Sequence, residues 1–195
     1  MADFYVENGR RIAVVADVSG HGVSSGFLMG MFKSGYLASL KLNTSIEDTL
    51  RCVNNVIIDN KPKSSFITCA IAEFSAGGKV SYSVAGHYPV FHYKYSSGEF
   101  SELHIKQIPV GVKKDYGFRT DSVEYEKGDL FLFLTDGLLE LKNSESEPFS
   151  LKLILDIAAQ NASHPAKLIA ERILGAVNSR GERRDDQTLM IVKCL

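Results

Sequence analysis

The sequence contains no tryptophan, five prolines and only three cysteines among its 195 residues. The cysteines, Cys52, Cys69 and Cys194, lie far apart and are odd in number, which argues against a disulfide framework and against a paired-cysteine metal site. Free cysteines are typical of a reducing compartment, because disulfides persist in oxidising ones. We therefore expect a cytoplasmic protein.

Long apolar runs and an excess of one charge are also missing. The longest apolar runs, such as residues 131–134, are far shorter than the about 20 residues that span a bilayer. The first ten residues, MADFYVENGR, lack the apolar core of a signal peptide. The 22 basic and 23 acidic residues leave a net charge of −1, whereas a general nucleic-acid binder usually has a basic excess. We expect neither membrane contact nor nucleic-acid binding.

What the sequence does contain is an ordinary globular composition, with 45% hydrophobic and 23% charged residues. Its length suits one domain over residues 1–195 with a sizeable core. The periodicity runs from a strand to helices, then to period-two strands with short turns, and back to helices and a strand. The expected elements are a strand over 11–16, a helix over 23–40, a second helix from 44, hairpins over 66–135, helices after 150 and a strand over 187–195. This order predicts an α+β fold in which two antiparallel β-sheets form a sandwich with helices on the outer faces.

Three local patterns in this outline predict specific features. Small residues recur every four positions along the first helix, which favours close packing of that stripe on a sheet. The T-x-x-E sequence at 44–47 predicts a helix-capping box. The segments 118–126 and 129–135 predict a hairpin joined at Lys127-Gly128. The small-residue stripe consists of Gly22, Gly26, Gly30, Ser34 and Ala38.

Three aspartates share one context, because each lies where an apolar strand reaches the surface. Asp17 ends IAVVA, Asp136 ends LFLFLT and Asp185 begins the polar entry to TLMIVKCL. Each of them alone could be a turn residue or a helix cap. Together they favour a cation site, since converging carboxylates would otherwise repel one another and hold a proton. Hard oxygen ligands suit magnesium or manganese, while the lack of paired cysteines and of H-x-x-x-H argues against zinc.

Four segments, in this order, resemble the motifs of the SpoIIE-like bacterial branch of the metal-dependent protein phosphatases (PPM family). They are DVSGHG at 17–22, AGHYP at 85–89, GDLFLFLTDG at 128–137 and DDQTLMIV at 185–192. The opening ADFY at 2–5 is similar to the end of the branch's G-G-D-F-Y-D motif. The resemblance covers essentially the whole chain.

The resemblance implies a specific fold and site. It implies a sandwich of two antiparallel sheets with helices outside, and two divalent cations, manganese or magnesium, that activate a water to hydrolyse phosphoserine or phosphothreonine on proteins. By position, Asp17 would bridge the metals and the Val18 carbonyl would supply a further oxygen. Asp136 and Asp185 would complete one metal. Asp3 and Asp186 match positions near an outer metal site.

Other candidate site residues are indicated by the local sequence rather than by the family resemblance. Arg183 and Arg184 precede Asp185 in a polar loop and could contact an acidic or phosphorylated partner through charge-assisted hydrogen bonds. A solvated loop is the alternative. His21 and His87 lie in glycine-containing turns, where a general acid and a local partner of the backbone are both open interpretations.

The resemblance also indicates a substrate and a context. The implied substrate is a phosphorylated STAS-type anti-anti-sigma regulator in bacterial signalling. The opening motif departs from the family at Met1, Ala2 and Val6. We therefore expect that the domain is excised from a longer protein with an N-terminal sensor or signalling domain. A homodimer is a further expectation.

Two other functions fit parts of the sequence. A non-catalytic binding or regulatory module of the same fold is the first, although the three retained aspartates argue against it. A haloacid-dehalogenase-type phosphatase with Asp17 as nucleophile is the second. That chemistry needs a D-x-D pair, whereas position 19 is Ser19, and it needs parallel strands rather than hairpins.

Overall fold

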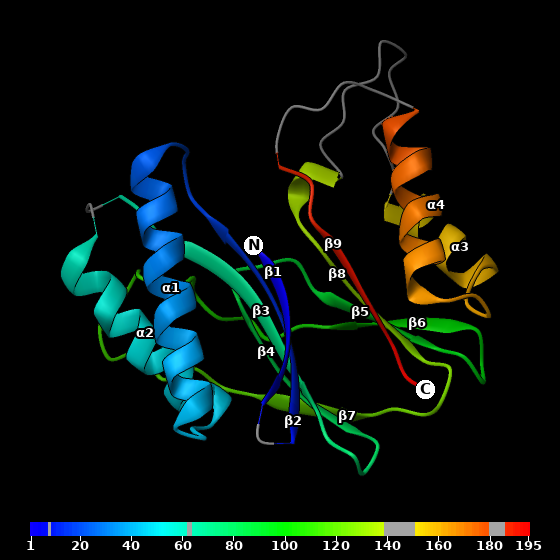
Figure 1. Cartoon of the computed structure of the whole chain (residues 1–195), viewed down its shortest axis with the longest axis horizontal. Helices are drawn as coiled ribbons and strands as arrows, with labels where there is room; N and C mark the ends of the chain where they lie inside the picture. The colour runs from blue at the N-terminus through cyan, green and yellow to red at the C-terminus, as the bar shows by residue number, and fades with distance from the viewer. Residues whose placement is uncertain (8, 62–63, 139–150, 180–185) are drawn as a thin grey trace. The chain divides into compact units, whose positions relative to one another are not determined.

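The computed structural model describes residues 1–7, 9–61, 64–138, 151–179 and 186–195. The chain divides into two compact units. The first comprises Met1–His87 with His104–Glu124, and the second Tyr88–Leu103 with Tyr125–Leu195. Within the described ranges, each unit has one antiparallel sheet and two α-helices (Figure 1). The predicted α+β class with two antiparallel sheets is confirmed, while a single domain over residues 1–195 stays a prediction.

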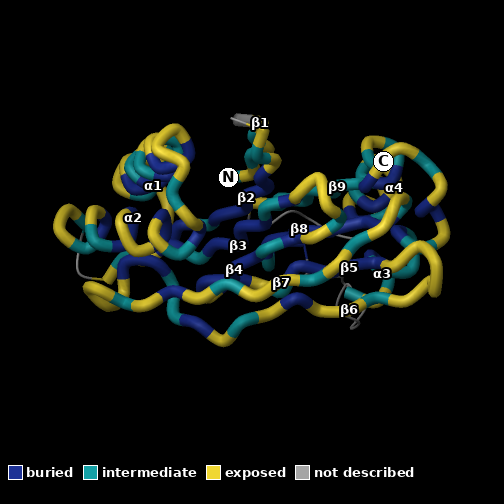
Figure 2. The backbone as a smooth tube through the Cα atoms, turned by 90° about the horizontal axis from the view of Figure 1, so that it is seen from below, coloured by how far each residue is buried: buried dark blue, intermediate teal, exposed yellow. Residues whose placement is uncertain are grey.

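The first unit is built on a five-stranded antiparallel sheet in the order β1-β2-β3-β4-β7. β2 and β3 are central strands of β-branched and small apolar residues, and both are mostly buried (Figure 2). The helices α1 (Val23–Lys41) and α2 (Ile46–Asn60) pack on this sheet. The strands are β1 Ala2–Glu7, β2 Arg10–Val18, β3 Ile67–Phe74, β4 Lys79–Ala85 and β7 Asp121–Glu124.

The alternation of side chains along β2 decides which residues meet the helices. The even-numbered residues from Ile12 to Val18 join one core cluster with Phe32 of α1 and Leu50 of α2. Successive side chains of a strand point to opposite faces. Asp17, an odd-numbered residue, therefore points to the face that α1 and α2 do not cover.

The second unit is built on a four-stranded antiparallel sheet in the order β6-β5-β8-β9. All five residues of β8 are buried, and the strand lies between β5 and β9. Two helices, α3 (Leu151–Gln160) and α4 (Ala166–Asn178), share a core cluster with β5 and β8. The strands are β5 Val90–Lys94, β6 Glu99–Leu103, β8 Leu130–Leu134 and β9 Leu189–Lys193, and the 3₁₀ helix η1 (Asp136–Leu138) follows β8.

The predicted hairpin over 118–126 and 129–135 is wrong. β7 pairs with β4 in the first unit, whereas β8 pairs with β5 and β9 in the second. β7 is a largely exposed edge strand, while β8 is apolar throughout. A fully buried strand needs a partner on each side, which its short and polar neighbour along the chain does not supply.

The predicted capping box of α2 is displaced by one residue. The N-cap is Ser45, whose Oγ accepts a 3.1 Å hydrogen bond from the Asp48 backbone N–H. Thr44 instead donates its hydroxyl to the Ser39 carbonyl at 3.1 Å. Glu47 accepts from the hydroxyl of Thr120. The S-x-x-D pattern at 45–48 therefore caps the helix in place of T-x-x-E.

The small-residue stripe of α1 does not pack on the sheet. All five of its residues are exposed, and a Cβ added at Gly26 or Gly30 would meet nothing within 4 Å. The buried side of α1 consists of Leu28, Phe32, Tyr36 and Leu40, together with Ser39. These large side chains also recur every four positions, and they remove far more apolar area from water than glycine and serine can.

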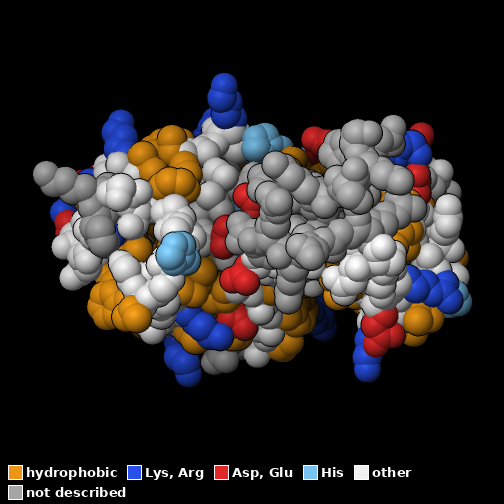
Figure 3. All heavy atoms as spheres, turned by 90° about the horizontal axis from the view of Figure 1, so that it is seen from above, with side chains coloured by type: hydrophobic (Ala, Val, Ile, Leu, Met, Phe, Trp, Pro, Cys, Tyr) orange, Lys and Arg blue, Asp and Glu red, His pale blue; other side chains and the backbone are white. Residues whose placement is uncertain are grey.

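Two further observations concern the surface of the described residues. None of the helices in the described ranges is long and apolar enough to cross a bilayer. On the face drawn in Figure 3, the Lys and Arg side chains project singly among acidic, polar and hydrophobic ones. The absence of nucleic-acid binding stays a prediction.

Candidate metal centre

Asp17 lies one residue before the end of β2. The residues before it, from Ile12 to Ala16, are all buried, while Asp17 itself is half-buried. In the register of the sheet it lies opposite Thr68 of β3. A rigid central strand therefore presents a carboxylate at the rim of the sheet, as a metal ligand requires.

The Val18 carbonyl points away from β3. Ala16 and Met1 bond through both of their backbone groups, at 2.7 and 2.9 Å, so the Ala16 groups point toward β1. Backbone groups alternate in direction along a strand. The Asp17 backbone groups therefore point toward β3 and those of Val18 point to the other side. Val18 and Asp17 thus supply a carbonyl and a carboxylate from adjacent positions.

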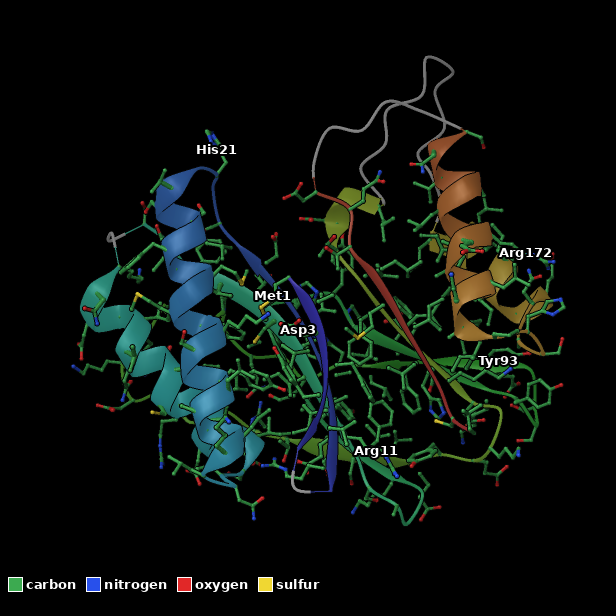
Figure 4. All side chains as sticks on the ribbon, viewed as in Figure 1. Met1, Asp3, Arg11, His21, Tyr93 and Arg172 are labelled. Carbon is green, nitrogen blue, oxygen red and sulfur yellow. The ribbon has the colours of Figure 1, made fainter. Side chains whose placement is uncertain are left out.

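The turn after β2 is held by backbone geometry and by one pair of hydrogen bonds. The Ser19 N–H donates to the Phe66 carbonyl at 3.0 Å, and Ser19 Oγ accepts from the Phe66 N–H at 2.9 Å. Gly20 and Gly22 have φ of 87° and 88°, where a side chain would be strained. His21 lies between them, exposed at the N-terminal tip of α1 and pointing outward (Figure 4).

His87 is the histidine that lies near Asp17. It is only 8% exposed, and its Nδ1 is 3.0 Å from the hydroxyl oxygen of Thr68. The same hydroxyl lies 3.5 Å from the Asp17 carbonyl oxygen. Thr68 thus links the His87 ring to the backbone of the strand that carries Asp17. Sequence reasoning gave Thr68 no role, although a threonine between buried apolar residues must find a partner for its hydroxyl.

Asp3 faces the other side of the sheet from Asp17. It pairs with Val14, whose side chain belongs to the cluster under α1 and α2. Its Oδ2 accepts from the Tyr5 hydroxyl at 2.8 Å and lies 2.9 Å from Nζ of Lys33 on α1. The hydrogen bond to Asp3 raises the pKa of the Lys33 ammonium. The structure does not bring Asp3 and Asp17 together, so the predicted outer site gains no support from Asp3.

The second unit carries Asp136 and Asp186. Asp136 is half-buried at the start of η1, and its Oδ1 accepts from the Gly137 N–H at 3.0 Å. Asp186 is exposed and lies before β9. Thr135 joins the two segments. Its N–H donates to the Thr188 carbonyl at 3.1 Å, its hydroxyl donates to the Asp186 carbonyl at 3.1 Å, and its Oγ1 accepts from the Thr188 N–H at 3.0 Å.

Thr135 is a supporting residue of this segment that sequence reasoning missed. It is buried, and it fixes the segment of Asp186 and Thr188 beside the end of β8. Asp185, Arg183 and Arg184 lie outside the described residues. In the part of the chain that the structure describes, no three His, Cys, Asp or Glu side chains form a group that could hold a metal ion. The sequence did draw attention to Thr135, since this residue directly precedes Asp136 at the end of an apolar run.

Comparison with known proteins identifies the family. Residues 7–195 match the family model of Stage II sporulation protein E (SpoIIE). The chain belongs to the SpoIIE family. The resemblance drawn from the four motifs is confirmed. The chain is 27% identical to phosphoserine phosphatase RsbU of Bacillus subtilis (strain 168) over 183 residues, covering 92% of this chain and 54% of RsbU.

Solved structures of SpoIIE relatives and other PP2C-type phosphatases share the fold. The RsbU and RsbW domains of Rv1364c from Mycobacterium tuberculosis match with a TM-score of 0.84 and 25% identity, over 99% of this chain and 54% of that chain. The catalytic domain of the serine/threonine phosphatase PstP in complex with 2 manganese ions matches with a TM-score of 0.69 and 16% identity, over 97% of this chain and 89% of that chain. The PstP match shows the fold alone. The chain spans about half the length of RsbU and of the Rv1364c chain.

Proposed function

We propose that this SpoIIE-family chain is a metal-dependent protein serine/threonine phosphatase. The observation that carries the proposal is the half-buried Asp17 carboxylate at the end of a buried strand, next to a Val18 carbonyl turned away from β3. Membership of a family that includes a phosphoserine phosphatase supports it. So does the PstP fold, which in its solved structure holds two manganese ions.

The donor atoms fit a hard divalent cation. Asp17, Asp136 and Asp185 would ligate manganese or magnesium through carboxylate oxygens, and Val18 through its carbonyl. When bound, two such cations supply an activated water and a positive charge for the phosphate. Three carboxylates would contribute about −3 against +4, so the site would attract a phosphate dianion.

The chain's own residues do the positioning. The β2 strand fixes Asp17 and Val18, and Thr68 links the backbone of Asp17 to His87. Thr135 fixes the segment before β9 beside Asp136. Arg183 and Arg184 would bind the phosphorylated partner. Asp186 would lie at the outer metal site, where its exposed carboxylate would contact the metal through a water molecule.

We propose further that the substrate is a phosphorylated STAS-type anti-anti-sigma regulator. The similarity to phosphoserine phosphatase RsbU supports a phosphoserine protein of bacterial signalling as the substrate class.

The experiment measures phosphate release by the purified chain from a phosphoserine peptide and from a phosphorylated STAS-domain protein, with manganese or with a chelator. We expect manganese-dependent release, faster from the STAS protein, and loss of release in Asp17→Asn. Asp156→Asn is the matched control, since Asp156 pairs with Lys152 on the surface of α3. Release that survives both chelation and Asp17→Asn contradicts the proposal. Partner binding without manganese-dependent heat or turnover would favour the non-catalytic module.

A further inference from the structure

The side chain of Asn54 on α2 is fully buried and holds a loop of the first unit. Its Oδ1 accepts a 2.8 Å hydrogen bond from the Gly111 N–H, and its Nδ2 donates to the Lys113 carbonyl at 2.9 Å. A buried amide that bonds backbone on both sides of one residue fixes the path of that loop. Asn54 therefore fastens residues 110–113 to α2.

Close packing of the loop on α2 supports the same conclusion. Gly111 has a φ of 90°, and a Cβ added there would lie 2.9 Å from Cγ2 of Ile57. Glycine is needed at this position for its backbone conformation and for its lack of a side chain. The loop thus rests directly on the buried face of α2.

Val110, which precedes Gly111, connects the loop to the first residue of β3. Val110 and Ile67 bond to each other through both backbone groups, at 2.8 and 2.9 Å. Ile67 in turn lies opposite Val18 in the sheet. Its neighbour Phe66 exchanges the two hydrogen bonds with Ser19 described above. A continuous set of hydrogen bonds and strand pairs therefore joins Asn54 to the turn that begins at Asp17.

We propose that Asn54 is a positioning residue for the metal centre. It fixes Val110 beside Ile67, and thereby fixes the end of β2 where Asp17 and Val18 supply their oxygens. This role rests on the proposed function, because it concerns the same site. Asp59 is the internal comparison: it is also on α2 and pairs with Lys114 of the same loop at 2.6 Å, but both side chains are more than half exposed.

Two substitutions test the role of Asn54. Asn54→Asp keeps the shape and the acceptor but loses the donor to Lys113, and Gly111→Ala pushes the loop from Ile57. We expect each to raise the manganese concentration for half-maximal hydrolysis of p-nitrophenyl phosphate about tenfold, as supporting residues of metal sites do. The rate at saturating manganese should change much less. Asp59→Asn should leave the half-maximal concentration within about twofold of wild type.

Hydrogen exchange of the unsubstituted chain tests the proposal without any variant. Manganese binding should slow exchange at the Gly111 and Ser19 amides together, because a ligand stabilises the structure on which its binding depends. The Gly78 amide, which donates to the Ser75 carbonyl in the turn between β3 and β4, should not change. Folded variants with wild-type manganese dependence, or unaltered exchange at Gly111, would overturn the role of Asn54. A wild-type chain without manganese-dependent hydrolysis would instead overturn the proposed function.

Discussion

The hydroxyl of Thr135 donates a 3.1 Å hydrogen bond to the carbonyl of Asp186, 51 residues further along the chain. Oγ1 of the same side chain accepts the Thr188 N–H at 3.0 Å. Thr135 directly precedes Asp136, and Asp186 directly follows Asp185. One buried threonine therefore joins the two chain segments that carry these aspartates. In the proposed function, this contact sets the spacing of two metal ligands within the second unit.

Replacing Thr135 by valine removes both side-chain hydrogen bonds and keeps the shape. We expect the free energy of unfolding to fall by about 1 kcal/mol, because the Thr188 N–H and the Asp186 C=O lose two partly buried hydrogen bonds. We also expect a higher manganese concentration for half-maximal activity. Urea unfolding and manganese titration of the activity measure the two effects. Thr135→Ser, which keeps the hydroxyl, should restore the manganese dependence; a valine variant with wild-type dependence would refute the positioning role.

Asp129 gives the second unit a pH-dependent part of its stability. Its Oδ2 lies 2.9 Å from Nε2 of the buried His92, and its Oδ1 accepts from the Tyr95 N–H at 2.9 Å. Burial alone would raise the pKa of this carboxyl. The hydrogen bonds from Tyr95, His92 and Glu126 outweigh burial, so the pKa is lowered below its usual range.

The sign of the pH dependence follows from this lowered pKa. The charged carboxylate stabilises the fold at pH above its unfolded pKa of about 3.9, and this stability is lost as the pH falls through the lower folded pKa. We expect Asp129→Asn to lose less unfolding free energy than wild type between about pH 5 and pH 2. Urea unfolding across this range measures the difference. An equal pH dependence of the unfolding free energy in the two proteins would show that the pKa of Asp129 is not lowered in the fold.

Gly86 is a close-packed position beside His87. Its φ is 62°, and a Cβ there would lie 2.5 Å from Cγ of Pro109. We expect Gly86→Ala to destabilise the fold by more than about 1 kcal/mol through strain and overlap. Thermal unfolding measures the effect. Gly77→Ala is the control, since a Cβ at Gly77 meets only Ser75 Oγ at 3.8 Å; equal losses in both would contradict the overlap.

Asp3 should matter little for metal binding, because it faces α1 and pairs with Lys33. We expect Asp3→Asn to change the half-maximal manganese concentration by less than about threefold, an effect smaller than that of ordinary supporting residues. Asp17→Asn, measured alongside, should abolish activation by manganese. A loss in Asp3→Asn as large as that in Asp17→Asn would place Asp3 among the ligands.

Much of the fold could be predicted because strong patterns coincide with the hydrophobic core. The apolar run before Asp17 became β2, and β5 and β6 form one of the hairpins expected over 66–135. The spacing of residues within a single helix predicted less of the packing than the long apolar runs did. Two stripes recur every four residues on α1, and the burial of large side chains, which the spacing does not reveal, selected Leu28 and Phe32 over Gly26 and Gly30.

The hydrogen-bond partners of the supporting residues could not be predicted from the sequence, for a physical reason. Thr68, Thr135 and Asn54 act through hydrogen bonds to backbone that is distant in sequence. Such partners depend on register and on the path of a loop, and a residue type alone specifies neither. The carboxylates could be predicted because a charge at the end of a buried strand is costly unless it has a use.

The proposed function requires that Asp17, Asp136 and Asp185 bind the same cations. Manganese titration calorimetry of wild type and of Asp17→Asn, Asp136→Asn and Asp185→Asn tests it most directly. We expect wild type to bind two ions, and each variant to lose affinity for the shared cation centre, although the three residues come from distant segments. Variants that each lose a separate ion, with the affinity for the other unchanged, would contradict it.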